Sequence, residues 1–385
     1  MPAFRPARRS AVAPFTVMEV LAAANRRAAE GLPVFHLEIG EPGGGPPAAV
    51  LDAARRALDG GRLGYTEALG LPELRAAIAA LYARRHGLAV DPARIAVTAG
   101  ASGAFVLGFL AAFDAGDRVA LATPAYPAYR NILEALGVEL VAVPTGPETR
   151  FQPTPELLEA VPGPLAGLVL QSPANPTGTM LAEAELGRLA AWCRARGVRL
   201  VADEIYHGIT YEQPAVSALA HLPEALIVNS FSKYWCMTGW RLGWAVVPED
   251  LSEPLTRLAQ NLFIAPSAIA QHAALAVLEA QAELDARVAG YRRNRDRLLA
   301  ALARGGLDRV APPDGAFYLW VDVRGRGEPA TRLCRRILEE TGVALTPGTD
   351  FDRERGEGWV RLSFAGAEAE VGEAAERLAA WLGRG

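Results

Sequence analysis

The sequence predicts an α/β protein with a three-layer αβα large domain around a mostly parallel sheet and a smaller α+β domain. Two observations predict this fold. From Pro47 to about Asp250, short apolar runs alternate with alanine-rich stretches of helical character, a pattern typical of buried parallel strands joined by helices. Towards the C-terminus the pattern becomes a mixture of strands and helices. We therefore expect residues 46–280 to form the large domain, and residues 1–45 with 281–385 to form the small one.

Five short apolar runs are the expected strands of the large sheet, over residues 94–98, 117–121, 165–170, 198–202 and 226–229. They have the length and apolar character of strands buried on both faces. Each is followed by residues that can take part in chemistry, namely Gly100 to Ser102, Tyr126, Asn175, Asp203 and Ser230. Since ligands of open α/β sheets bind beyond the carboxyl ends of the strands, we expect these residues to line one crevice.

The elements after the large sheet predict the small domain. Residues 251–306 are expected to be helical, and residues 35–39 form a strand outside the main alternation, which places the N-terminal segment with this domain. The remaining elements are a half-exposed strand, a helix, a second strand and an amphipathic helix, over residues 317–323, 331–340, 359–364 and 368–382.

Composition and charge exclude several classes of protein. A hydrophobic content of 51% supports a large core, and a net charge of −4 gives no basic field for nucleic acid or acidic membranes. Three scattered cysteines predict neither a disulfide framework nor a zinc site, and the five histidines lack metal-ligand spacing. No apolar run has the length of a membrane span. We expect a cytoplasmic protein without a metal site.

The segment Ser230 to Gly243 contains the most informative residue, Lys233. Almost all of the 39 lysine and arginine residues are arginine, so this lysine is exceptional, and it lies among small, apolar and hydroxyl side chains, with Arg241 following. An amine that is removed from water and placed near another cation has its charged form disfavoured, so it becomes nucleophilic. The segment therefore predicts a lysine that forms a Schiff base.

Asp203 and Asn175 are candidate ligand-binding residues with simpler alternatives. Asp203 ends an apolar strand, where its carboxylate either opposes a protonated pyridine nitrogen or caps a helix. Asn175 precedes a proline and lies near Gly178, which is first of all a turn pattern. A turn at the end of a strand nevertheless holds an amide rigidly enough to bind a cofactor oxygen or a substrate carboxylate.

Two further groups suit the binding of anions. Gly100 to Ser102 begin a helical stretch, so backbone N–H groups and a hydroxyl could hold a phosphate together with Ser230 and Arg241, although serine at a helix start is commonly a simple cap. Arg361 lies in an apolar predicted strand, where an unpaired guanidinium is costly. Either a bidentate carboxylate ligand or an internal salt bridge would satisfy it.

Together these residues resemble the pyridoxal-phosphate enzymes of fold type I, specifically the class I/II aminotransferases of the aspartate aminotransferase superfamily. The resemblance covers nearly the whole chain, in order and in spacing. It includes Ile39 to Pro42, Tyr65 and Thr66 with Gly70, Leu74 and Arg75, Gly100 to Ser102, Pro124 to Pro127, Asn175 to Gly178, Asp203 to Tyr206, the Lys233 segment, Gly315 to Tyr318 and Arg361 to Phe364.

The resemblance implies pyridoxal 5′-phosphate as cofactor and a role for each residue of its ring site. Lys233 would hold the cofactor as an internal aldimine and then carry the proton between the substrate Cα and the cofactor C4′. Asp203 would keep the pyridine nitrogen protonated. Tyr206 and Asn175 would bind the phenolic oxygen, and Tyr126 would stack on the ring.

The same resemblance implies the anion sites and a dimer. The phosphate cup would consist of Gly100, Ala101, Ser102, Ser230, Ser232 and Arg241. Arg361, with Asn175 and the backbone of Gly40, would bind the substrate α-carboxylate. Tyr65 is similar to the tyrosine that family members donate to the neighbouring site across a homodimer interface.

The implied activity is transamination in amino-acid metabolism, from an L-amino acid to a 2-oxo acid such as 2-oxoglutarate or pyruvate. The alternative is a C–S β-lyase of the same fold, which shares the lysine and the arginine. A DNA-binding regulator is disfavoured because no basic stripe or helix-turn-helix precedes residue 40. No arginine can be assigned to a distal carboxylate from spacing, and the loop from Gly43 to Pro47 hints at an apolar-tolerant pocket.

Two departures from the family pattern concern local packing. Cys236 stands where the lysine signature usually has a small residue, and Ser172 to Ala174 replace the more usual lead-in to the Asn175 turn. Neither position carries a proposed role in the chemistry.

Overall fold

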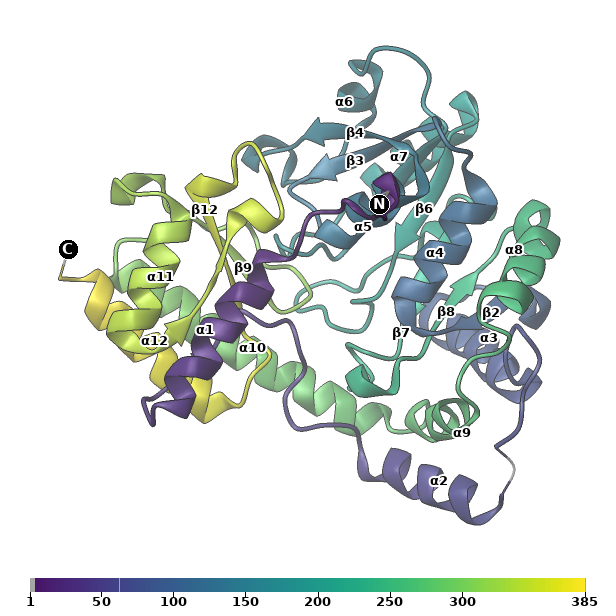
Figure 1. Cartoon of the computed structure of the whole chain (residues 1–385), viewed down its shortest axis with the longest axis horizontal. Coiled ribbons are helices and arrows are strands. Elements are labelled where there is room, and N and C mark those ends of the chain that lie inside the picture. The colour runs from purple at the N-terminus through teal and green to yellow at the C-terminus, as the bar shows by residue number, and fades with distance from the viewer. Residues whose placement is uncertain (1–3, 62, 385) are drawn as a thin grey trace.

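The computed structural model describes residues 4–61 and 63–384, and its centre is a seven-stranded sheet in the order β2-β8-β7-β6-β5-β3-β4 (Figure 1). The neighbours from β7 through β6, β5 and β3 to β4 pair in parallel, whereas β8 pairs antiparallel with β2 and β7. The strands are β2 (Ile95–Thr98), β3 (Arg118–Thr123), β4 (Glu139–Pro144), β5 (Gly167–Gln171), β6 (Arg199–Asp203), β7 (Leu226–Ser230) and β8 (Gly243–Val246).

Helices cover both faces of this sheet, as the predicted three-layer fold requires. Alternate residues of a strand point to opposite faces, so Val201 packs with the α4, α5 and α8 side while Leu200 and Ala202 pack with the α3 and α7 side. The helices of this part are α2 (Ala48–Asp59), α3 (Pro72–His86), α4 (Gly100–Ala112), α5 (Pro127–Leu136), α6 (Pro155–Glu159), α7 (Glu183–Arg196), α8 (Glu249–Leu262) and α9 (Ala268–Val277).

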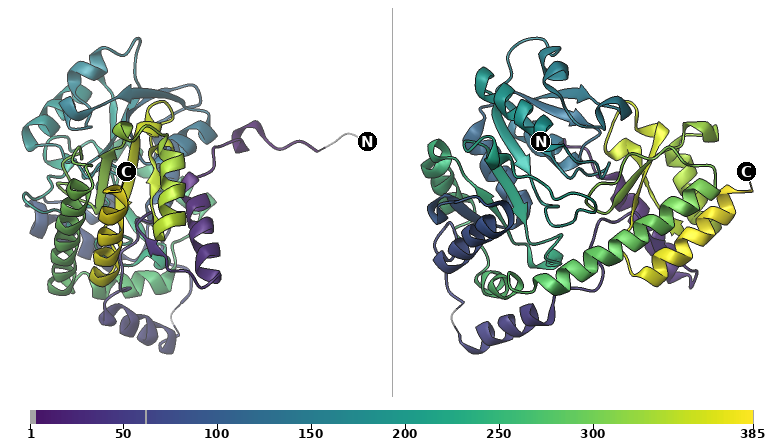
Figure 2. Two further views of the ribbon diagram at one scale, coloured as in Figure 1. Left: turned by 90° about the vertical axis from the view of Figure 1, so that its left-hand side faces the viewer. Right: turned by 180° about the vertical axis from the view of Figure 1, so that it is seen from behind.

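A second group of elements packs beside the large sheet, and the long helix α10 extends from one part to the other (Figure 2). Its sheets are the antiparallel β11-β12-β9 and the parallel pair β1-β10, in which Phe35 aligns with Val343. The elements are α1 (Thr16–Ala29), β1 (Phe35–His36), α10 (Gln281–Arg304), β9 (Tyr318–Asp322), α11 (Ala330–Thr341), β10 (Val343–Ala344), β11 (Thr346–Pro347), β12 (Trp359–Ser363) and α12 (Glu368–Leu382).

Strand β9 differs from its prediction. Its sequence predicts a half-exposed strand, but all of its residues are buried. The reason is that both faces are covered: Leu319 and Val321 pack into the main core, whereas Trp320 packs with Phe151 and Phe351. The mixture of aromatic and polar residues that suggested a solvent face therefore lies between two apolar clusters.

The N-terminal helix α1 is fixed by an acidic side chain from a distant part of the chain. Asp350, in the short helix Gly348–Asp350, accepts hydrogen bonds from the backbone nitrogens of Thr16 at 2.7 Å and Val17 at 3.0 Å. The carboxylate thus caps the N-terminus of α1, which has no capping side chain of its own. In residues 4–61 and 63–384, no helix combines the length and the apolar character needed to span a bilayer.

Candidate active site

A cavity of about 440 Å³ lies at the carboxyl ends of the central parallel strands, where the large sheet meets the small one. The structure brings almost all of the predicted site residues into its lining; Gly100 lies beside it, and Tyr65 lies elsewhere. The predicted residues in the lining are Gly40, Ala101, Ser102, Tyr126, Asn175, Asp203, Tyr206, Ser230, Ser232, Lys233, Arg241 and Arg361. The expected convergence of the strand ends on one crevice is therefore found.

Lys233, the only lysine of the sequence, follows β7 and extends into this cavity. Its Nζ donates a hydrogen bond to the carbonyl oxygen of Gly40 at 2.6 Å. Burial, and next the charge of Arg361, lower the pKa of the Lys233 amine to about 8, and Glu41 partly opposes this shift. At pH 7 about a tenth of the amine is therefore unprotonated, far more than of a lysine with its ordinary pKa, and a nucleophile requires this form.

Because the pKa of Lys233 is lowered, the free energy of unfolding of the ligand-free protein should depend on pH. An unfolded lysine has a pKa of about 10.4, so between pH 8 and that value the unfolded chain binds more protons than the folded one. The free energy of unfolding should therefore rise with pH across this window through Lys233, by on the order of 1–3 kcal/mol. Lys233→Met should abolish that rise and should be more stable than the wild type at pH 7.

Urea unfolding of both proteins at pH 7 and pH 10 measures this difference. Subtracting the variant from the wild type cancels the tyrosines and other groups that titrate in the same range. If the difference in free energy of unfolding between the two proteins were the same at both pH values, the pKa of Lys233 would not be lowered by burial.

Asp203 ends β6 and is almost completely buried, with 3% of its surface exposed. Its Oδ1 accepts from the backbone nitrogen of Ile205 at 3.0 Å, and its Oδ2 accepts from Gln171 Nε2 at 3.0 Å and from the Tyr129 hydroxyl. Burial raises the pKa of Asp203 to about 6, against the opposing effect of these donors. The alternative of a helix cap is wrong, because β6 is followed by a turn. A buried carboxylate facing a cavity suits a cationic ligand atom.

The N-terminus of α4 has the features of an anion-binding site. The helix begins without a capping side chain, and Gly100 has a φ of +72°. A Cβ at that position would lie 2.7 Å from Arg241 Nη2, so glycine is needed for the arginine to approach the helix end. Arg241 Nη1 donates to the carbonyl oxygen of Thr238 at 2.9 Å, and the hydroxyls of Ser230 and Ser232 lie 3.0 Å apart nearby. Helix dipole, guanidinium and hydroxyls together suit a phosphate group.

Arg361 on β12 is buried, and the described residues give it no ion-pair partner. Its Nη1 donates to Asn175 Oδ1 at 2.9 Å, and its Nη2 donates to the carbonyl oxygen of Glu38 and to Thr346 Oγ1 at 3.4 Å. The guanidinium also lies over the Tyr318 ring, 4.5 Å from its centroid. In the described part of the chain, no carboxylate forms an ion pair with it, and its Nε has no hydrogen-bond partner. The internal salt bridge that the sequence left open is therefore not found.

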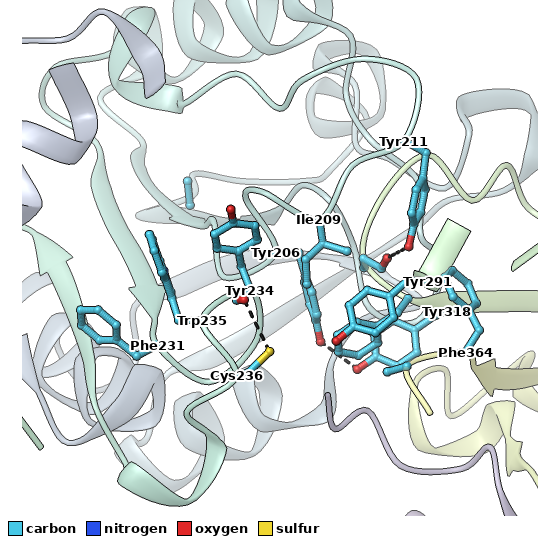
Figure 3. Close-up of a cluster of buried hydrophobic side chains, with 14 of the residues drawn as sticks. Tyr206, Ile209, Tyr211, Phe231, Tyr234, Trp235, Cys236, Tyr291, Tyr318 and Phe364 are labelled. Carbon is cyan, nitrogen blue, oxygen red and sulfur yellow. Dashed lines mark hydrogen bonds between the residues drawn. The ribbon is translucent and has the colours of Figure 1, made fainter. Parts of the chain in front are cut away.

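The aromatic residues around the cavity are held against one another. Tyr206 and Tyr318 share a hydrogen bond of 2.8 Å between their hydroxyls, which face each other in Figure 3. Tyr126 lies edge-on to Tyr129 with ring centroids 5.5 Å apart. Gly40 is required by this packing, because a Cβ there would lie 1.8 Å from the Tyr318 hydroxyl oxygen.

The structure adds residues that the sequence did not indicate. Phe15, Val17, Met18 and Leu21 bring an apolar wall from α1 and the residue before it, although only a small-domain role was expected for this segment. The charged and polar additions to the lining are Glu41, Gln171, Thr238 and Asp350. Apolar residues at helical spacing were the only signal in α1, and they equally suit a helix packed on a core.

Other singled-out residues lie outside the cavity lining. Tyr65 is 88% exposed, and Gly43 instead donates its N–H to the carbonyl oxygen of Ala365 at 3.0 Å. The loop that suggested an apolar-tolerant pocket therefore does not line it.

Cys236 is buried at a φ of +56°, with its Sγ 3.6 Å from the carbonyl oxygen of Tyr234. Within the described ranges, no group of histidine, cysteine and acidic side chains could hold a metal ion.

Comparison with known proteins gives a consistent result. The family described as aminotransferase class I and II matches residues 33–378. The chain is 50% identical to a valine–pyruvate aminotransferase of Mycobacterium tuberculosis over 98% of each chain, and 37% identical to an aspartate/prephenate aminotransferase of Thermus thermophilus over 97% of each chain.

Solved structures agree with the sequence relatives. The crystal structure of an aminotransferase from M. tuberculosis superimposes with a TM-score of 0.97 at 48% identity over 100% of each chain. That of a putative aminotransferase from Silicibacter pomeroyi gives 0.94 at 46% identity, over 99% of this chain and 100% of that one. The chain therefore belongs to the aminotransferase class I and II family and is a transaminase of the α/β fold that its sequence predicts.

Proposed function

We propose that this transaminase uses pyridoxal 5′-phosphate to move the amino group of an L-amino acid with a small apolar side chain, such as valine, to pyruvate. The M. tuberculosis relative that is 50% identical carries the name valine–pyruvate aminotransferase. This relative and the T. thermophilus relative are both named as aminotransferases, which favours transamination over the C–S β-lyase alternative. The observation that carries the proposal is Arg361, a buried guanidinium in the cavity lining that lacks an ion-pair partner among the described residues.

The residues present fit the cofactor. Its pyridine nitrogen would lie against the Asp203 carboxylate, its phosphate at the α4 N-terminus with Arg241, and its carbonyl carbon would be attached to Lys233 Nζ. When bound, pyridoxal 5′-phosphate accepts the electrons that remain when the substrate Cα loses its proton. Around it, Tyr206 and Asn175 would bind the phenolic oxygen and Tyr126 would cover one face of the ring. Gly100, Ala101, Ser102, Ser230 and Ser232 would complete the phosphate site.

The chain's own groups supply binding and proton transfer. Arg361 would bind the α-carboxylate of either substrate, because its guanidinium lines the cavity and its bonds to Asn175 and Glu38 hold the guanidinium plane that suits a bidentate carboxylate. Lys233, with its pKa lowered to about 8, would take the proton from the substrate Cα and return one on the way to product. Asn175 would fix the guanidinium plane, and the carbonyl oxygen of Gly40 would orient the amine.

The substrate preference follows from the cavity wall. The α1 residues Phe15, Val17, Met18 and Leu21 make an apolar surface, and Glu41 and Asp350 add negative charge. The lysine and arginine residues of the lining are Lys233, Arg241 and Arg361, each of which already has a proposed duty. A distal carboxylate would therefore meet apolar or acidic side chains. Pyruvate and small aliphatic amino acids suit this wall better than 2-oxoglutarate and aspartate do.

Profiling of amino donors and acceptors tests this function. We expect kcat/KM for valine with pyruvate to exceed that for aspartate with 2-oxoglutarate by at least about 100-fold, because one unpaired buried charge costs several kcal/mol. Equal rates for the two pairs would overturn the substrate assignment. Formation of pyruvate and ammonia from cysteine conjugates, without any oxo-acid acceptor, would instead indicate a β-lyase.

We further propose a cytoplasmic homodimer. Tyr65 is 88% exposed, and Leu262, Phe263 and Ile264 are exposed apolar residues at the end of α8, beside the α4 N-terminus. A second copy would cover these side chains and would bring Tyr65 to the neighbouring phosphate site, as the family resemblance implies. The three cysteines are unpaired and buried, which suits a reducing compartment. Residues 46–280 would be the large domain, and residues 1–45 with 281–385 the small one.

A further inference from the structure

One amide side chain in the cavity lining bonds to both halves of the site. Gln171, the last residue of β5, donates from Nε2 to Asp203 Oδ2 at 3.0 Å and accepts at Oε1 from the backbone nitrogen of Asn175 at 2.8 Å. Its own backbone is fixed as well, because Gln171 aligns with Asp203 in the β5–β6 ladder. The side chain therefore joins the end of β6 to the turn that follows β5.

The two hydrogen bonds fix the orientation and the chemistry of this amide. The oxygen must face the Asn175 N–H, so the nitrogen must face Asp203 and can only donate. Asp203 then receives donors alone, from Gln171, Tyr129 and Ile205. Donors favour the ionised carboxylate, so they oppose the rise in pKa that burial causes. Leucine could make neither bond, and an ionised glutamate could accept from Asn175 but could not donate to Asp203.

Through Asn175, the hydrogen bonds of Gln171 connect to Arg361, the arginine proposed to bind the substrate carboxylate. The N–H of Asn175 is held by Gln171, and its side-chain Oδ1 accepts from Arg361 Nη1 at 2.9 Å. Asn175 and Arg361 are both about 5% exposed, so these bonds are sheltered from water. A continuous series of hydrogen bonds thus runs from Asp203 through Gln171 and Asn175 to Arg361.

We propose that Gln171 is a positioning residue that couples the two binding regions: it keeps Asp203 ionised and oriented towards the cofactor ring, and it holds Asn175 so that Arg361 is aligned with the substrate carboxylate. The inference rests on the proposed function for the identity of the two ligands. Its distinctive content is that one side chain bonds to both Asp203 and Asn175, whereas the hydrogen bond of the Tyr129 hydroxyl goes to Asp203.

Three variants distinguish the bond of Gln171 to Asp203 from its bond to Asn175. Gln171→Leu removes both bonds. Gln171→Glu, assayed at a pH at which the new carboxyl group is ionised, keeps an acceptor for the Asn175 N–H but loses the donor to Asp203. Tyr129→Phe loses only a donor to Asp203. Gln152→Leu is the matched control for loss of a buried glutamine. Gln152 donates to Thr179 at 3.1 Å and, over a longer 3.5 Å, to the backbone carbonyl oxygen of Gln171, which a change of the Gln171 side chain leaves in place; its side chain lies outside the cavity lining.

Each holoenzyme is compared with the wild type in four measurements. These are the dissociation constant of pyridoxal 5′-phosphate, the dissociation constant of the non-reacting 2-methyl analogue of valine, the apparent pKa of the cofactor absorbance and the urea midpoint. All three test variants should weaken cofactor binding about tenfold or more and shift the absorbance pKa, because each removes a hydrogen bond to a buried charge. Only Gln171→Leu should also weaken the 2-methyl analogue, by about tenfold.

The results distinguish a coupling role of Gln171 from a purely structural one. A Gln171→Leu protein that binds the analogue as the wild type does would overturn the coupling, and so would one that differs from the wild type only in urea midpoint, as expected of Gln152→Leu. If Gln171→Glu weakened the analogue as much as leucine does, the Asn175 bond would not be the link. The proposed function fails by a different result, a wild-type protein that does not bind pyridoxal 5′-phosphate, and the inference would fall with it.

Discussion

Lys233→Ala protein is expected to lose transaminase activity by about 10⁴-fold or more, because the substitution removes the nucleophile and the group that moves the Cα proton. No other side chain can take over, since the sequence contains no second lysine. Arg241 and Arg361 also line the cavity, but a guanidinium stays protonated and cannot attack a carbonyl carbon.

The single lysine also makes the attachment itself easy to measure. Borohydride reduction of the wild type should fix one cofactor per chain, and the intact mass alone should report it, because the α-amino group is the chain's only other amine. Lys233→Ala should show no fixed cofactor after the same treatment. The control is its urea midpoint, which shows that the variant is folded. Alanine protein that still carried fixed cofactor would contradict the assignment of Lys233.

Much of the fold could be predicted because the central strands are buried on both faces. The five apolar runs correspond to β2, β3, β5, β6 and β7. Strand β4 is absent from the prediction because it lies at the edge of the sheet, where exposed Glu139 and Pro144 at its two ends leave a run of only four apolar residues between them. Strand β8 is absent from the prediction because its first residue, Gly243, is the last residue of the Lys233 segment, whose composition suggested only a binding loop, and only three residues follow it.

Some site residues can be recognised from their neighbours in the sequence, whereas others depend on partners that are distant in the sequence. Asp203, Asn175 and Ser230 follow recognisable strands, so topology alone places them together. Gln171 and Tyr129 act through a partner that is distant in sequence, 32 and 74 residues from Asp203, and their own neighbourhoods look like an ordinary strand end and helix. Tyr65 is exposed in one chain, so only resemblance gives it a role.

Arg361→Leu should raise the KM for both the amino acid and the oxo acid by about 100-fold or more, with a much smaller change in kcat. Both substrates carry an α-carboxylate, and losing a buried charge pair costs about 3–5 kcal/mol. An effect on only one substrate, or on kcat alone, would exclude the common carboxylate site.

The same substitution should leave the free energy of unfolding of the ligand-free protein within about 1 kcal/mol of the wild type. Leucine removes a buried charge that has no ion pair among the described residues, and this gain offsets the hydrogen bonds that Glu38 and Asn175 lose. Arg355 is the matched control, because it pairs with buried Asp352 and lies outside the cavity lining.

Arg355→Leu should lower the free energy of unfolding by about 1–3 kcal/mol, since it leaves Asp352 buried without its partner, and it should not change either KM. The two arginines thus predict opposite patterns. Removing an arginine that stabilises the fold lowers the free energy of unfolding. Removing an arginine reserved for a ligand lowers the affinity for that ligand and leaves the free energy of unfolding nearly unchanged. If Arg361→Leu behaved like Arg355→Leu, its guanidinium would be structural, and the substrate carboxylate would have to bind elsewhere in the cavity.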